Sequence, residues 1–153
     1  MDDVIKIIEG NILEAPEDII CQQVNCQGVM GSGLALQIIK KYPEVYTQYR
    51  SFCKIYWDNL LGAICFVKTK NKIIACLFGQ DDYGRSKKVY TIYHALEYAL
   101  ESTKIYAENN NLSVAIPYGI GCGLANGDWE IVKEMIDRVF SNYKNVVIYK
   151  LIS

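Results

Sequence analysis

Hydrophobic and polar residues follow two different periods along this chain. Six short apolar segments, several rich in β-branched residues, are typical of strands, and four longer segments place apolar residues three and four positions apart, as amphipathic helices do. The predicted strands cover residues 4–8, 18–25, 62–68, 72–78, 112–117 and 145–152. The predicted helices cover residues 31–42, 43–54, 90–107 and 128–143. Pro43 ends the first helix and opens the second, because proline fits a first helical turn.

The order of these segments predicts the fold class. Strands and helices follow one another as β-β-α-α-β-β-α-β-α-β, and the late strands are apolar over nearly their whole length. Such strands are buried on both faces, so we expect an α/β sheet covered by helices on both sides. The strands on either side of residues 69–71 indicate a hairpin. Because no repeat, low-complexity segment or linker divides the sequence, residues 1–153 are expected to form a single domain.

Composition narrows the classes of function. Hydrophobic residues make up 51% of the chain and charged residues 22%, with a net charge of −1, which is typical of a globular protein. This balance gives no general attraction to nucleic acid and leaves only a local basic patch around Arg85, Lys87 and Lys88. No apolar run approaches the roughly 20 residues of a membrane span, and the first residues lack the pattern of a secretion signal. We therefore expect a cytoplasmic protein without a membrane partner.

The six cysteines are expected to be free thiols. No two of them form a C-x-x-C pair and the chain has one histidine, His94, so the pattern does not indicate a zinc site. Most lie inside apolar segments, where cysteine packs as a small hydrophobic residue. They are Cys21, Cys26, Cys53, Cys65, Cys76 and Cys122. A Cys–His enzyme is also disfavoured, because a nucleophilic thiolate needs a nearby base.

Two glycine-rich junctions, each between a predicted strand and a predicted helix, are the main functional signal. The first is "VNCQGVMGSGLA" at residues 24–35 and the second is "IPYGIGCGLANGDW" at residues 116–129. Ligands of open α/β sheets bind where strands end and helices begin, and bare backbone there lets N–H groups approach an anion. Two such loops could hold a diphosphate from both sides, although each alone also fits a tight turn for close packing. Neither loop matches the P-loop or the dinucleotide-binding fingerprint.

Several segments together resemble a known family. The segments "EGNIL", "VNCQGVMGSGLALQIIKKYPEVYTQY", "LLGAICFV", "IIACLF" and "IPYGIGCGLANGDWEIV" look, in this order, like those of a macrodomain, the ADP-ribose-binding fold. More narrowly, the sequence resembles the branch that holds terminal ADP-ribose glycohydrolases, DNA de-ADP-ribosylating antitoxins and ADP-ribose 1″-phosphate phosphatases. The stretch "LLGAICFV…IIACLFGQ" is more similar to the phosphatase type. The resemblance implies a three-layer α/β/α fold with a mixed, mostly parallel central sheet.

The resemblance also implies which residues bind the substrate. The first loop would surround the distal ribose and the diphosphate, with Asn25 bonding ribose hydroxyls, and the second loop would hold the diphosphate from the other side. Asn11 stands where the family often has an aspartate that accepts a hydrogen bond from adenine. Apart from the resemblance, Tyr83 and Tyr118 are candidates either for stacking on ribose or adenine or for ordinary packing. The implied set is Asn11, Ile12, Asn25, Gly31, Ser32, Gly33, Leu34, Pro117, Gly119, Ile120, Gly121, Cys122, Gly123 and Leu124.

The catalytic positions depart from the family pattern. The glycohydrolase and antitoxin types carry a lysine where this chain reads "FGQDDYGR", and the glycohydrolase type has an aspartate where this chain has Ala125. A lysine-linked covalent mechanism is therefore not supported. The remaining catalytic candidates are Asp81, Asp82 and Arg85, with one acid as the base on a water and Arg85 paired with these acids or with a substrate phosphate. The two acids also fit ordinary turn residues, and Asp128 fits a helix N-cap.

These observations predict a hydrolase that binds ADP-ribose and removes a group from the 1″ position of its distal ribose. Loop N–H groups would position the substrate and stabilise charge, and either an acid or the substrate phosphate would activate water. The expected partner is ADP-ribose or an ADP-ribosylated substrate, and no cofactor or metal is expected. The alternative is a non-catalytic reader of ADP-ribose. A module acting on ADP-ribosylated nucleic acid is disfavoured by the charge balance.

Overall fold

The described part of the chain forms one sheet with helices on both of its faces. The computed structural model describes residues 5–152. The strands are β1 (Ile7–Glu9), β2 (Ile19–Val24), β3 (Ile64–Lys68), β4 (Ile73–Phe78), β5 (Val114–Pro117) and β6 (Val146–Lys150). The helices are α1 (Gly33–Lys41), α2 (Pro43–Ile55), α3 (Tyr93–Asn110) and α4 (Trp129–Val139), with a short 3-10 helix η1 (Ile12–Glu14). This order confirms the predicted succession of strands and helices.

The sheet is mixed and mostly parallel, as expected. Its strand order is β1-β6-β5-β2-β4-β3. β1 with β6, β6 with β5, β5 with β2 and β2 with β4 are parallel pairs, whereas β3 and β4 form the predicted antiparallel hairpin. β2 pairs with β4 along its whole length, from Ile19 opposite Ile73 to Val24 opposite Phe78. β2 and β4 are therefore two parallel strands of six residues each that are buried over nearly their whole length.

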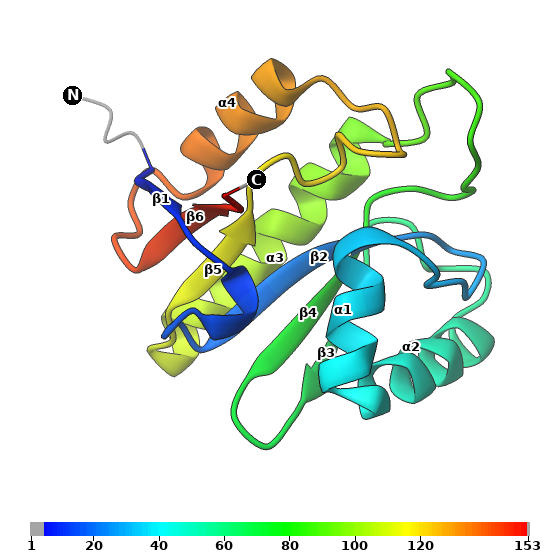
Figure 1. Cartoon of the computed structure of the whole chain (residues 1–153), viewed down its shortest axis with the longest axis horizontal. Coiled ribbons are helices and arrows are strands. Elements are labelled where there is room, and N and C mark those ends of the chain that lie inside the picture. Colours follow the sequence, from blue (N-terminus) through cyan, green and yellow to red (C-terminus); the bar gives the residue numbers. More distant parts are fainter. Residues whose placement is uncertain (1–4, 153) are drawn as a thin grey trace.

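Two hydrophobic cores hold the three layers together. Figure 1 shows α1 and α2 on one face of the sheet and α3 and α4 on the other. Alternate residues of β2 serve the two cores, since Ile20 packs with the α1 and α2 side and Cys21 with the α3 and α4 side. Leu96 of α3 and Ile38 of α1 are fully buried, and burying one such side chain stabilises a fold by about 1.5–3 kcal/mol. These cores confirm the predicted α/β/α layering.

Several helices and strands begin or end at residues other than the predicted ones. The helix predicted from residue 90 begins at Tyr93, since the N–H groups of Tyr90 and Thr91 donate to the Ala125 carbonyl instead. α1 begins at Gly33 rather than residue 31, because Ser32 keeps an extended backbone as its N-cap. The first strand covers residues 7–9 rather than 4–8, and residue 4 lies outside the described residues. The last helix and the last strand are shorter than predicted.

Asp128 has the structural role that the sequence indicates. It is the N-cap of α4, and its side chain accepts a hydrogen bond of 2.9 Å from the Glu130 N–H, which satisfies one of the free donors of the first turn.

Among the helices of residues 5–152, none has the length and apolar character needed to cross a membrane.

Candidate functional site

The site is the crevice between the ends of β2 and β5. These strands are parallel neighbours in the sheet, yet the chain leaves β2 for α1 on one face and leaves β5 for α4 on the other. The two connections therefore diverge, and a crevice opens at the carboxyl ends of the strands. Such a switch point is where open α/β sheets bind ligands.

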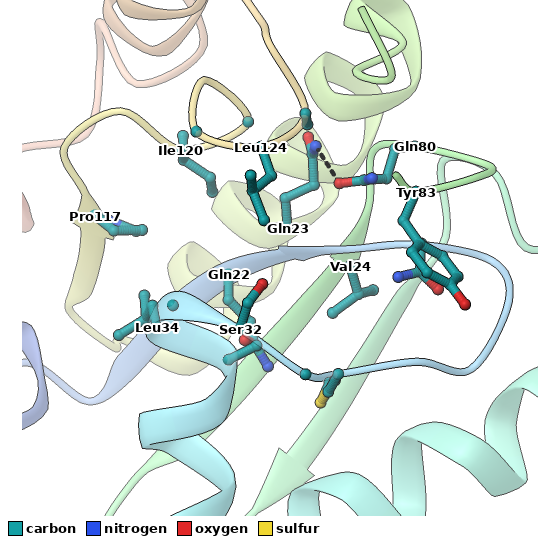
Figure 2. Close-up of a pocket in the computed structure, with 18 of the residues that line it drawn as sticks. Gln22, Gln23, Val24, Ser32, Leu34, Gln80, Tyr83, Pro117, Ile120 and Leu124 are labelled. Carbon is teal, nitrogen blue, oxygen red and sulfur yellow. Dashed lines mark hydrogen bonds between the residues drawn. The ribbon is translucent and has the colours of Figure 1, made fainter. Parts of the chain in front are cut away.

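A pocket of about 670 Å³ occupies this crevice, within the usual range for small-molecule sites. Three parts of the chain line it, as Figure 2 shows: the end of β2 with the first glycine loop, the segment after β4, and the second glycine loop. The lining residues are 22–25, 29–35, 80, 83–85, 117–121 and 123–125. Arg85 is the one charged side chain among them. The pocket wall is therefore mostly backbone, amide and apolar surface.

The first glycine loop presents unpaired backbone donors to the pocket. Ser32 is the N-cap of α1 and makes no side-chain capping bond, and the first turn of α1 carries no acidic residue. Within the described residues, no hydrogen bond uses the N–H groups of Gly31, Ser32 or Gly33. A helix N-terminus whose N–H groups are free carries partial positive charge and attracts anions. This end of the pocket is therefore suited to a phosphate group.

The second glycine loop is held in a conformation that needs glycine. Gly121 has a φ of +74°, which is strained for a residue with a side chain. Its carbonyl accepts hydrogen bonds from the Gly127 N–H at 2.9 Å and from the Thr91 hydroxyl at 2.6 Å. A Cβ on Gly127 would lie 2.4 Å from that same carbonyl oxygen, so the close approach excludes any larger residue. In the part of the chain that the structure describes, the N–H groups of Gly119 and Gly121 have no partner.

Asn25 is buried and organises the first loop from inside. Its Oδ1 accepts hydrogen bonds from the Gln27 N–H at 2.9 Å and from the Tyr49 hydroxyl at 3.0 Å, and its Nδ2 donates to the Val29 carbonyl at 2.9 Å. Tyr49, fully buried on α2, has one hydroxyl hydrogen, which lies between this Oδ1 and the nearer Asn25 backbone carbonyl at 2.6 Å. Asn25 lines the pocket, but most of its side-chain capacity serves the loop. A direct bond from Asn25 to a ribose stays a prediction.

The three predicted catalytic residues lie in different places. Arg85 lines the pocket, whereas Asp81 and Asp82 are exposed and outside its lining. The Asp81 backbone carbonyl accepts a hydrogen bond from the Cys26 N–H, and the Asp82 carboxylate accepts one from the Tyr83 N–H at 2.8 Å. These are contacts of turn residues, and neither Asp81 nor Asp82 is among the residues that line the pocket. Arg85 is the one member of the trio that the structure brings to the pocket.

Most of the implied substrate-binding residues meet at the pocket, and three do not. Asn11 caps η1, with its side-chain oxygen accepting from the Leu13 N–H at 3.0 Å, and Ile12 is buried in the core on the α1 and α2 side. Cys122 lies in the second loop without lining the pocket. The residues that do line it are Asn25, Gly31, Ser32, Gly33, Leu34, Pro117, Gly119, Ile120, Gly121, Gly123 and Leu124.

Three glutamines in the pocket wall were not predicted. Gln22 and Gln23 are consecutive residues of β2, and Gln80 follows β4. Gln23 donates through Nε2 to the Gln80 Oε1 and to the Thr91 Oγ1, both at 2.9 Å (Figure 2 shows the first of these bonds). The sequence signal for them was the pair of adjacent amides, Gln22 and Gln23, in the middle of an apolar strand. Burying a polar group there destabilises the fold unless the group is hydrogen-bonded.

The cysteines near the site are not poised as nucleophiles. All six cysteines are free. Burial raises the pKa of the Cys26 thiol to about 11, helped by the negative charge of Asp81. Burial raises the pKa of the Cys122 thiol to about 11 as well, with a contribution from Asp128. Both thiols are therefore protonated at neutral pH, and His94 is exposed at the start of α3, away from the pocket lining.

The sequence and the fold of this chain are similar to those of known proteins. A family model described as Macro domain matches residues 21–136. A "DNA ADP-ribosyl glycohydrolase" of Mycobacterium tuberculosis is 32% identical over 152 residues, which are 92% of this chain and 40% of that protein. An "ADP-ribose 1''-phosphate phosphatase" of Lodderomyces elongisporus is 30% identical over 158 residues, which are 94% of this chain and 98% of the relative. The solved macrodomain of Mycobacterium tuberculosis DarG superposes with a TM-score of 0.81 at 26% identity, over 97% of each chain.

Replacing Tyr49 with phenylalanine should destabilise the fold by about 1–3 kcal/mol, because the buried Asn25 carbonyl then loses a hydrogen-bond donor. Urea unfolding measures this change, and Tyr46→Phe, on the same helix but with no hydrogen bond found for its hydroxyl in residues 5–152, is the matched control. Equal stability of the two variants would contradict the role of the Tyr49–Asn25 contact.

Alkylation of Cys26 and Cys122 by iodoacetamide should be slow at pH 7.5 and should rise about tenfold per pH unit toward pH 11. A thiol with a pKa near 11 holds about 300 times less thiolate than a free cysteine of pKa about 8.5. Peptide mapping by mass spectrometry measures each site, with the urea-unfolded protein as the control. Rapid labelling of either site at neutral pH in the folded protein would show a depressed pKa and reopen a nucleophilic role.

Proposed function

Because this chain belongs to the macrodomain family, we propose that it binds ADP-ribose and hydrolyses a group from the 1″ position of the distal ribose. The observation that carries the proposal is the pair of glycine loops that face each other across one pocket, each with unpaired backbone N–H groups. The printed names of two curated relatives, a glycohydrolase and a phosphatase, support hydrolysis of ADP-ribose derivatives. The chain spans 40% of the length of the first of these relatives.

The pocket suits a diphosphate that has a sugar on either side. Phosphates need donors, and the two loops offer them from opposite walls without a lysine. Arg85 adds one positive charge at the pocket, which favours a substrate with a further phosphate. Tyr83 and Tyr118 offer aromatic surface for a ribose or base. In this proposal Asn11 and Ile12 contribute at the adenine end through the η1 segment.

Catalysis would depend on positioning and charge stabilisation. In the phosphatase form, the oxygen of a water bonds to phosphorus, the bond between phosphorus and the 1″ oxygen breaks, and the departing ribose oxygen takes up a proton. The water's proton passes either to a substrate phosphate oxygen or to a carboxylate of the Asp81–Asp82 pair. We favour the substrate phosphate, because neither carboxylate lines the pocket. Arg85 and the loop N–H groups would stabilise the developing negative charge.

A non-catalytic reader of ADP-ribose is the second candidate. Among the described residues that line the pocket none is acidic, and Ala125 stands where the glycohydrolase type of the family has an aspartate. A site without a general base can bind its ligand, but the activation of water then depends on a group of the substrate itself. The two candidates share the same binding mode and differ only in turnover.

Replacing Gly31 with glutamate should weaken ADP-ribose binding by about 100-fold or more, since a carboxylate would face the diphosphate across a few ångströms. Gly31 has an ordinary backbone conformation, and a Cβ there meets nothing within 4 Å, so the variant should fold. Isothermal titration measures the affinity, with Gly31→Gln as the neutral control of equal size. Equal affinities of the two variants would show that no anion binds at the first loop.

The native protein should release phosphate from ADP-ribose 1″-phosphate, and Asp82→Asn should retain this rate within about twofold because the carboxylate lies outside the lining. A malachite-green assay measures release, and titration with ADP-ribose measures binding in the same preparation. Loss of turnover with binding retained would instead identify Asp82 as the base. Binding of ADP-ribose without release by the native protein would favour the reader.

A further inference from the structure

Gln22 is a buried amide without an adequate partner. It lies in the middle of β2, and its side chain is 2% exposed. Its Oε1 accepts no hydrogen bond within the described residues. Its Nε2 has one partner there, the Cys76 sulfur at 3.4 Å, and burial keeps that thiol protonated by raising its pKa well above the usual range. A neutral sulfur is a weak acceptor, so the amide is nearly unsatisfied.

The fold gives no structural reason for a polar residue at this position. Neighbouring β2 residues that point to the same face, Ile20 and Val24, are apolar members of the core on the α1 and α2 side. An unsatisfied buried amide destabilises a protein by about 1–3 kcal/mol relative to a well-packed apolar residue. Native structures hold few such groups, and each needs an explanation, such as strain, a bound water or ion, or a role in binding or catalysis.

The next residue, Gln23, differs from Gln22 in the bonds that its side-chain nitrogen makes. Gln23 leaves β2 on the opposite face, as Figure 2 shows, and both hydrogens of its amide are used, by Gln80 and by Thr91. Its Oε1, like that of Gln22, accepts no hydrogen bond within the described residues, so the two glutamines differ in what their amide nitrogens bond. Thr91 in turn donates to the Gly121 carbonyl, so Gln23 ties the strand to the second glycine loop. Gln22 has no such link, yet it lines the same pocket.

We propose that Gln22 is a specificity residue whose side-chain oxygen accepts a hydrogen bond from a ribose hydroxyl of the bound ligand. This inference rests on the proposed ADP-ribose function. A buried acceptor needs a donor, and a diphosphate at neutral pH offers acceptors, whereas the ribose hydroxyls offer donors. The site would then reject a ligand that fills the glycine loops but brings no hydroxyl, because the Gln22 oxygen would stay unpaired.

The test is Gln22→Met, which keeps the length and volume of the side chain and removes the amide. Native protein and variant are titrated with ADP-ribose and with inorganic diphosphate, and thermal unfolding is recorded without ligand. We expect about a tenfold loss of affinity for ADP-ribose, no change for diphosphate, and a melting temperature equal to or about 2–4 °C above that of the native protein. Gln37→Met, at an exposed position of α1, should change neither affinity nor stability.

The outcomes separate this inference from the function on which it rests. Undiminished affinity of Gln22→Met for ADP-ribose, in a native protein that binds it, would overturn the inference alone. An equal loss for both ligands, or a marked fall in melting temperature, would also overturn it, since the glutamine would then support the loop or an internal water. Failure of the native protein to bind ADP-ribose would overturn the proposed function, and the inference with it.

Discussion

The parallel pairing of β2 with β5 is the constraint on which the site depends. The register that sets Ile19 opposite Val114 and Ile20 opposite Ala115 brings the ends of two strands together, although nearly a hundred residues of chain separate them. Because α1 and α4 then cover opposite faces, both strand ends remain open and each continues into a glycine loop. This pairing places the two sets of free N–H groups around one pocket.

In the proposed function, the pocket would hold negative charge mainly with neutral groups. Arg85 is its one charged side chain, and the loops supply backbone dipoles whose orientation is fixed before a ligand arrives. Gly127 and Thr91 both bond the Gly121 carbonyl, so this peptide group is held in place from two sides. Fixed dipoles need no reorganisation when charge appears, which is the physical advantage of such a cradle over mobile lysines. In the proposed function, the same property would serve both binding and catalysis.

Three amides at the end of β2, Gln22 and Gln23 in the strand and Asn25 directly after it, line the pocket and have different roles there. Asn25 shapes the first loop through Tyr49, and Gln23 connects the strand to the second loop through Thr91. Gln22 makes no comparable contact within the described residues. A core strand with two amides, followed at once by a third, is less stable than an apolar one, and proteins tolerate such local conflicts mainly where function needs them. The polar end of β2 is therefore best understood as part of the site.

The sequence by itself determined the order of the elements, the layering and the two glycine loops, because these follow from local periodicity and from residues such as Pro43 and Asp128 whose effects are local. It also carried enough of the family pattern to name most of the residues that line the pocket. Only the tertiary structure decided which side chains face that pocket. Asp81 and Asp82 turned out to lie outside its lining and Gln22 inside it, because the direction of a side chain depends on strand register and on hydrogen bonds between residues far apart in the chain, which no local pattern records.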